Sequence, residues 1–72
     1  MKVGDVVMFV CEGVYEKWFF GQLGIIKSYT PVGADGNPHC RVEWMNPVPY
    51  HDSFSKVSDF RADKFEVAYA GR

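Results

Sequence analysis

The sequence predicts an all-β domain, an antiparallel barrel of about five short strands with a 3₁₀ turn before the last one. No window repeats apolar residues at the spacing of a helix face, and glycine or proline interrupts most stretches. From Cys40 to Trp44, apolar residues instead alternate with charged ones, which is typical of a half-buried strand. Asp35-Gly36 lies shortly before, and this pair suits a hairpin turn.

The first half of the chain contains two strands around an aromatic loop. A continuous apolar run predicts a first strand over Asp5–Cys11, covered on both faces, with Gly4-Asp5 as the turn before it. The segment Glu12–Gln22 is expected to be a long loop, because it has glycine near both ends and no strand pattern. The second strand is expected over Leu23–Thr30.

The second half begins with a glycine-rich connection, Pro31–Pro38, which leads into the third strand. Asn46-Pro47-Val48-Pro49 should end that strand, because proline cannot donate a hydrogen bond to a neighbouring strand. The next segment, Tyr50–Lys56, is either a short edge strand or an irregular loop. We expect it to precede a single helical or 3₁₀ turn over Asp59–Asp63, capped by Ser58 or Asp59.

The last strand is predicted over Phe65–Ala68, and Tyr69–Arg72 should fray. The 72 residues are expected to form one domain, residues 1–72, with no internal repeat. With 47% hydrophobic and 24% charged residues, the composition is that of a folded globular chain. The predicted core is Val7, Phe9, Leu23, Ile26, Val42, Trp44, Phe60, Phe65 and Val67.

Charge and cysteine content exclude several classes of function. A net charge of −1 and a pI near 6.0 give no general attraction to phosphate. The longest apolar run, Val6–Cys11, is too short to span a membrane, so we expect a cytoplasmic protein without membrane insertion. Cys11 and Cys40 lie far apart without C-x-x-C spacing, which favours free thiols over zinc or redox chemistry, although a disulfide between neighbouring strands stays open.

The order of these segments resembles a known class of small barrels. Lys2-Val3-Gly4-Asp5 at the start, Gly24-Ile25-Ile26, Val42-Glu43-Trp44 and a closing Phe65-Glu66-Val67 are similar to SH3-like β-barrels of the KOW and MIB/HERC types. The outline also resembles the photosystem I reaction-centre subunit IV family, with Pro38 and Asp59-Phe60-Arg61-Ala62 at matching places. This likeness implies an accessory subunit of a larger complex, whereas the Lys-Val-Gly-Asp opening is similar to small phage proteins and suggests a phage or marine microbial source.

Aromatic residues form the main candidate site. Phe, Tyr and Trp make up 17% of the chain, more than so small a barrel can easily enclose, so some should be exposed. One interpretation is a protein-binding patch, and the other is a plug in which Trp18 and Phe20 close one barrel end. Self-association would also bury such a surface. The candidate partner-binding residues are Tyr15, Trp18, Phe19, Phe20, Tyr50 and Phe54.

Nucleic acid is the alternative partner, with Trp18 or Tyr29 stacking on bases and phosphates contacted by Lys17, Lys27, Arg41, Lys56 and Arg61. Interleaved acidic residues weaken this interpretation.

Metal binding and catalysis are not expected. His39 and Cys40 are strand neighbours and point to opposite faces, so they would not share a metal with His51 and Asp52. Ser53 and Ser55 near His51 lack a nucleophile elbow or an oxyanion hole. The chain is therefore expected to be a non-catalytic protein-interaction or assembly module without cofactors.

Overall fold

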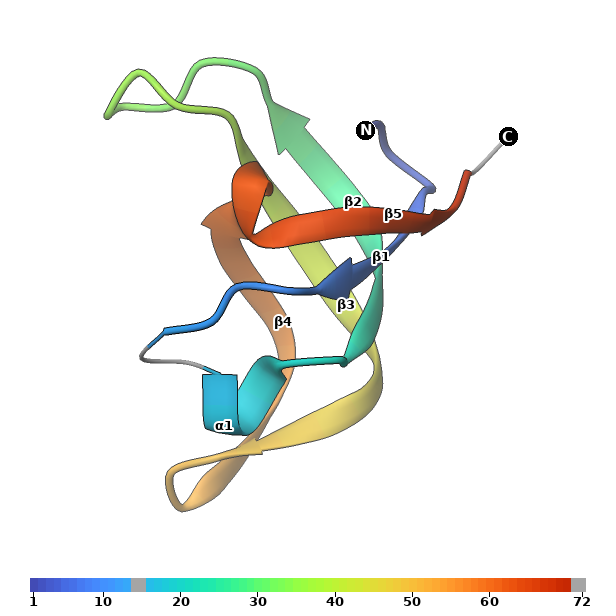
Figure 1. Ribbon diagram of the computed structural model, residues 1–72, viewed down its shortest axis with the longest axis vertical. Helices are drawn as coiled ribbons and strands as arrows, with labels where there is room; N and C mark the ends of the chain where they lie inside the picture. The colour runs from blue at the N-terminus through green and yellow to red at the C-terminus, as the bar shows by residue number, and fades with distance from the viewer. Residues whose placement is uncertain (14–15, 71–72) are drawn as a thin grey trace.

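The computed structural model describes residues 1–13 and 16–70, and it is all-β apart from two short helical turns (Figure 1). The expected all-β class is therefore confirmed. Its elements are β1 (Val6–Phe9), α1 (Glu16–Phe19), β2 (Leu23–Thr30), β3 (His39–Tyr50), β4 (Ser53–Arg61), the 3₁₀ helix η1 (Ala62–Lys64) and β5 (Phe65–Tyr69).

The five strands form one antiparallel sheet in the order β4-β3-β2-β1-β5. The sheet curves around the core, and η1 connects its two outer strands, β4 and β5 (Figure 1). These outer strands do not pair with each other, so the sheet is open and is not closed into a barrel by hydrogen bonds. Among the described residues, no helix has the length and hydropathy needed to cross a membrane.

The loop predicted between the first two strands contains a helical turn, α1, which corrects the prediction of an irregular segment. Four residues are too few for intrinsic propensity to stabilise a helix, and α1 is instead held by the burial of Phe19, which is only 2% exposed. The chain leaves α1 through Gly21, whose φ of 79° suits glycine. The amide of Gln22 donates to the carbonyl of Phe19, the last residue of α1, at 2.9 Å. This hydrogen bond closes the turn that follows the helix.

The predicted end of the third strand is wrong, because β3 continues through both prolines to Tyr50. A two-residue turn makes Tyr50 and Ser53 the hydrogen-bonded pair, so the next pair, Pro49 and Phe54, needs no amide donor directed at β4. Beyond Trp44, none of the described strands pairs with the other side of β3. Proline is tolerated on such a free edge. The register of β3 and β4 also shifts between Glu43 and Val48, so the β3 residues between these two positions, Pro47 among them, are not in regular pairing.

The 3₁₀ turn before the last strand is confirmed, but it begins later than expected, at Ala62. Neither predicted cap is used, because the Ser58 hydroxyl accepts from the Trp44 indole and the Asp59 carboxylate accepts from Arg41. The strand β5 includes Tyr69, assigned by the sequence to a frayed end, because Tyr69 pairs with Val6.

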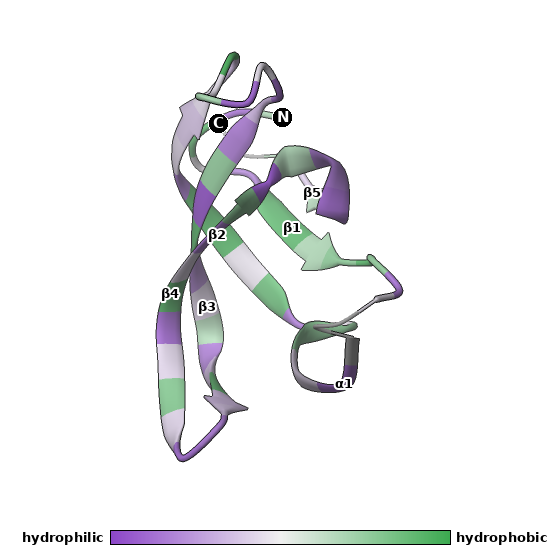
Figure 2. Cartoon of the chain, turned by 90° about the vertical axis from the view of Figure 1, so that its left-hand side faces the viewer, coloured by the Kyte–Doolittle hydropathy of each residue, from purple (hydrophilic) through white to green (hydrophobic). Residues whose placement is uncertain are grey.

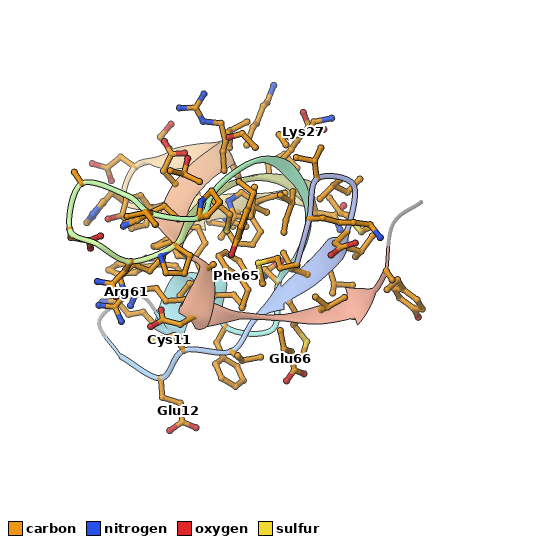
Figure 3. The ribbon with its side chains drawn as sticks, turned by 90° about the horizontal axis from the view of Figure 1, so that it is seen from above. Cys11, Glu12, Lys27, Arg61, Phe65 and Glu66 are labelled. Carbon is orange, nitrogen blue, oxygen red and sulfur yellow. The ribbon has the colours of Figure 1, made fainter. Side chains whose placement is uncertain are left out.

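The core lies on the concave side of the sheet, where Phe65 points inward and Glu66 outward (Figure 3). Two predicted core residues, Leu23 and Phe60, are half-buried, and Val67 is exposed because β5 is a short edge strand. Gly24 permits the close pairing of β2 with β3, since a Cβ there would overlap the Val42 side chain and lie 2.9 Å from the Glu43 carbonyl oxygen. The buried apolar residues are Val7, Phe9, Phe19, Ile26, Cys40, Val42, Trp44, Val48, Ala62 and Phe65.

Candidate functional site

A pocket of about 220 Å³ lies between α1 and the β3–β4 hairpin. Aromatic rings form its apolar part, and residues of β4 contribute the polar groups. Its lining residues are Phe19, Tyr50, Ser55, Ser58, Asp59 and Phe60.

An aromatic cluster forms the rim of this pocket at the end of the hairpin. The Trp18 ring stands edge-on to Tyr50, with centroids 5.0 Å apart and planes at 77°, and lies 5.3 Å from the His51 ring. The ring centroids of Tyr50 and His51 are 4.2 Å apart. Edge-to-face pairs of this kind stabilise beyond the area they bury, so the rim is a preformed aromatic surface. The ammonium group of Lys17 lies 4.3 Å from the Trp18 ring centroid.

His51 occupies the first position of the hairpin turn in a left-handed conformation, with φ of 56°. Such a conformation is uncommon for a residue other than glycine and persists where surrounding contacts hold it. Here the rings of Tyr50 and Trp18 supply those contacts. The strained turn and the aromatic rim therefore support one another.

A chain of hydrogen bonds forms the polar floor of the pocket. The indole Nε1 of Trp44 donates to Ser58 Oγ at 2.9 Å, Ser55 Oγ donates to the Val57 carbonyl at 3.3 Å, and the two serine oxygens are 2.9 Å apart. Either serine can be the donor of this last bond. The floor is therefore a pair of mutually bonded serine hydroxyls.

Asp59 also lines the pocket, but its carboxylate is held on the outer face of the sheet by Arg41 from the neighbouring strand, because Asp59 alternates with the inward Ser58 and Phe60. The Arg41 Nε donates to Asp59 Oδ1 at 3.0 Å and its Nη2 donates to Oδ2 at 3.3 Å. These bonds raise the pKa of the Arg41 guanidinium above its ordinary value. The Asp59 carboxylate is therefore bonded to Arg41 on the outer face and is not part of the serine floor.

The structure separates the residues of the predicted aromatic patch. Trp18 and Tyr50 lie together at the pocket rim, whereas Phe19 is core and forms the pocket wall. Phe54, 68% exposed, is on the opposite face of the hairpin from Tyr50, and Phe20 is 47% exposed. Tyr15 lies outside the described residues. Of the two residues expected to close a barrel end, Phe20 is exposed and Trp18 is only partly buried, and the buried residue of the segment is instead Phe19.

Sequence reasoning missed the polar half of the pocket, which comes from Ser55, Ser58 and Asp59. These residues belong to β4, which is longer than the sequence predicts. The prediction that Pro47 and Pro49 end the third strand left no partner along which a long fourth strand could pair. Ser58 and Phe60 are two residues apart, with charged Asp59 between them, and this two-residue spacing is the signal that a strand prediction for the segment would have used.

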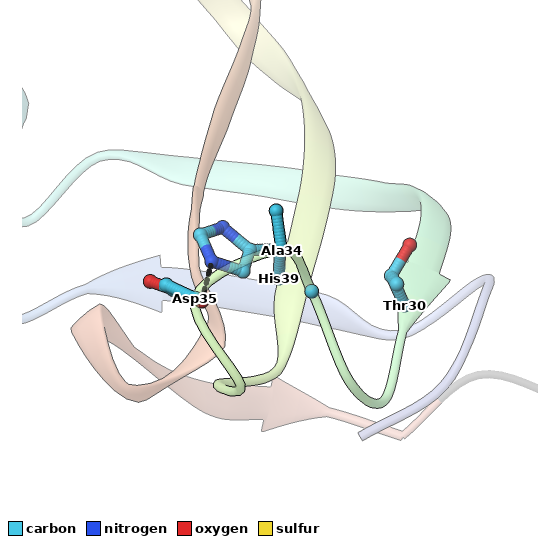
Figure 4. A pocket seen from close by; sticks show the side chains of 5 residues that line it. Thr30, Ala34, Asp35 and His39 are labelled. Carbon is cyan, nitrogen blue, oxygen red and sulfur yellow. Dashed lines mark hydrogen bonds and ion pairs between the residues drawn. The ribbon is translucent and has the colours of Figure 1, made fainter.

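A second hollow, of about 500 Å³, lies at the other end of β3 and is lined by Thr30, Gly33, Ala34, Asp35 and His39 (Figure 4). The His39 Nε2 and Asp35 Oδ1 atoms are 2.9 Å apart, and the Asn37 amide donates to the same carboxylate oxygen at 3.0 Å. The Asn37 amide and then His39 lower the pKa of Asp35 to about 2. These contacts brace the β2–β3 connection.

Two of the residues weighed for metal binding, His39 and His51, lie at opposite ends of β3. His39 is at the start of β3 and His51 follows its end, so the eleven residues from Cys40 to Tyr50 lie between them. No group of three described His, Cys, Asp or Glu side chains is placed to hold a metal ion. Cys11 and Cys40 are free thiols, and Lys64 Nζ donates to Cys11 Sγ at 3.6 Å.

Comparison with known proteins identifies no relative: the chain matches no family model, no curated protein and no solved structure.

Proposed function

We propose that this chain is a non-catalytic protein-interaction module, and that the groove between α1 and the β3–β4 hairpin binds an extended peptide segment of a partner protein. The observation that carries the proposal is the pocket itself, with aromatic walls and a floor of hydrogen-bonded serine hydroxyls. The strand order and the 3₁₀ turn before β5 support the proposed SH3-like class, whose members include peptide-binding domains.

The size of the pocket favours a single inserted side chain over a cofactor. Sites for small molecules typically have volumes of about 300 to 1,000 Å³, and this pocket has about 220 Å³. The Trp18–Tyr50 rim then provides a surface on which the flanking peptide lies. The proposed ligand therefore inserts one residue and spreads its neighbours over the aromatic rim.

The floor also selects the chemistry of the inserted side chain. The Ser55 and Ser58 hydroxyls are available to hydrogen-bond a ligand. A buried hydroxyl left without a partner would cost free energy. The preferred insert is thus an aromatic or aliphatic side chain that ends in a group able to hydrogen-bond a hydroxyl.

Charge pairing favours a protein partner over nucleic acid. Lys27 lies 3.9 Å from Glu43, and Arg41 and Arg61 are bonded to Asp59 and Asp63. Phosphate binding depends on cations that release counterions from the nucleic acid, and these three cations already face carboxylates. The net charge of −1 adds no attraction.

Selection from a displayed library of random dodecapeptides tests the proposal. Peptides selected on the wild-type chain should bind Trp18→Ser about tenfold more weakly or worse, because an interface aromatic is lost. They should bind Phe20→Ser as well as wild type, because Phe20 adjoins the same helix but does not line the pocket. Equal binding by both variants, or failure to select any peptide while an oligonucleotide binds, would refute the proposal.

A further inference from the structure

The β3–β4 hairpin extends beyond the rest of the sheet as a two-stranded arm, residues 45–56. Pairing between β2 and β3 ends at Gly24 and Trp44, whereas β3 and β4 stay paired to Tyr50 and Ser53. Figure 2 shows this arm as a narrow ribbon, with α1 on one side of it. Two-stranded ribbons are at best marginally stable alone and need packing on a face.

The two faces of the arm have different surroundings. Val48 and Tyr50 face inward, where Val48 is fully buried and Tyr50 packs against α1. The pair Pro49 and Phe54 must then face outward, because strand neighbours alternate. Met45 follows the inward Trp44, and Val57 pairs with the exposed Glu43, so both also face outward. This outer face is 49% exposed at Met45, 68% at Phe54 and 46% at Val57.

Polarity on the outer face changes at the base of the arm. Above it the same face carries the ion pairs Lys27–Glu43 and Arg41–Asp59. Along the arm, the only charged residue within the two strands is Lys56. Sheets with one face in water usually carry polar side chains on that face. The apolar outer face therefore indicates a contact surface rather than a solvated one.

We propose that a second copy of this chain covers the outer face, with two arms packed face to face about a two-fold axis. The charges bordering the patch cancel pairwise, two cations against two carboxylates. Such a border attracts neither a basic nor an acidic partner, and it does not repel an identical face. The net charge of −1 on each chain adds little repulsion.

A two-fold contact also limits the number of copies that the apolar arm can bring together. The same patch is used by both copies, so association stops at a dimer. Face-to-face sheets keep their strands within about 30° of each other, which allows two ribbons to cover one another along their length. The peptide groove lies on the opposite face, so dimerisation is independent of the function proposed above.

Sedimentation velocity from micromolar to millimolar concentration tests this inference. The wild-type chain should form a reversible dimer, and Phe54→Ser should raise its dissociation constant about tenfold or more. Val32→Ser is the matched control, because Val32 is 71% exposed on the β2–β3 connection, away from the arm. The control should dimerise as wild type does. Far-UV circular dichroism checks the fold, and Val57→Thr provides a second, milder change in the same patch.

A wild-type chain that stays monomeric to millimolar concentration would overturn the proposal, as would equal dimerisation of Phe54→Ser and Val32→Ser. Formation of trimers or open-ended oligomers would also overturn it, because a two-fold contact closes at two copies.

Discussion

Phe19 and Phe20 are adjacent, chemically identical and both part of the predicted aromatic site, yet their burial differs sharply. Phe19 is 2% exposed, and its ring centroid lies 5.9 Å from that of Phe9, 5.2 Å from Trp44, 5.4 Å from Tyr50 and 5.3 Å from Phe60. Phe20 is 47% exposed. We therefore predict that replacing each with alanine has very different effects on stability.

Truncating a buried phenylalanine to alanine typically costs about 3 to 5 kcal/mol, from lost transfer free energy and from the cavity left behind. A small domain is stable by about 5 to 15 kcal/mol, and one of this size belongs near the lower limit. Phe19→Ala should thus remove most of the stability and lower the melting temperature by roughly 15 to 30 °C. Phe20→Ala should cost about 1 kcal/mol or less.

Urea unfolding followed by tryptophan fluorescence measures both changes, since Trp44 is stacked on Phe19 and reports on this part of the core. Far-UV circular dichroism supplies a second probe of the same transition. The reasoning fails if Phe19→Ala costs less than about 1.5 kcal/mol, well below the range for buried phenylalanine. It fails equally if the two variants lose the same stability.

Three further predictions follow from other parts of the structure. Gly24→Ala should lower the unfolding free energy by about 1 to 3 kcal/mol, because its Cβ would press on Val42 and the Glu43 carbonyl; Gly13→Ala, with only Cys11 Sγ nearby at 3.9 Å, is the control and should change little. Asp35 has a pKa of about 2 against an ordinary 3.8, so its stabilising effect is present above about pH 4 and is lost as pH falls towards 2. Asp35→Asn should weaken the fall in unfolding free energy between about pH 4 and pH 2, measured by unfolding at several pH values. A fall as steep as that of the wild-type chain would contradict this role of Asp35. Burial raises the pKa of the Cys40 thiol to about 11, so the native chain should alkylate rapidly only at Cys11, as read by peptide mass mapping, and rapid Cys40 labelling would show that it is not buried.

The second strand shows how much local sequence can predict. Leu23–Thr30 is the observed β2, because glycine precedes it, a Pro-Gly-rich connection follows it, and its inner residues pair with two neighbours. The failure at Pro47 and Pro49 has an equally specific cause. Whether proline ends a strand depends on which of its edges is free, and that depends on where the neighbouring strand stops.

The candidate site was half predictable for a similar reason. The sequence predicts Trp18 and Tyr50 as partner-binding residues because the chain has more aromatic residues than so small a barrel can easily enclose, and the fold brings their rings together. Phe54 was selected on the same grounds but faces the other way, because a hairpin of this register places residues 49 and 54 opposite residues 50 and 53. A shift of one residue reverses the face of every side chain.

The sequence by itself determined the all-β class, the positions of the turns and the alternation that makes one face of the central strands apolar. These are local properties, set by backbone preferences and by the two-residue period of a strand. Only the tertiary structure decided that Phe19 fills the core, that the serine hydroxyls line a pocket, and that the arm keeps an apolar outer face. Those outcomes depend on strand register and on which edges remain unpaired, and both are set by contacts between segments distant in the chain.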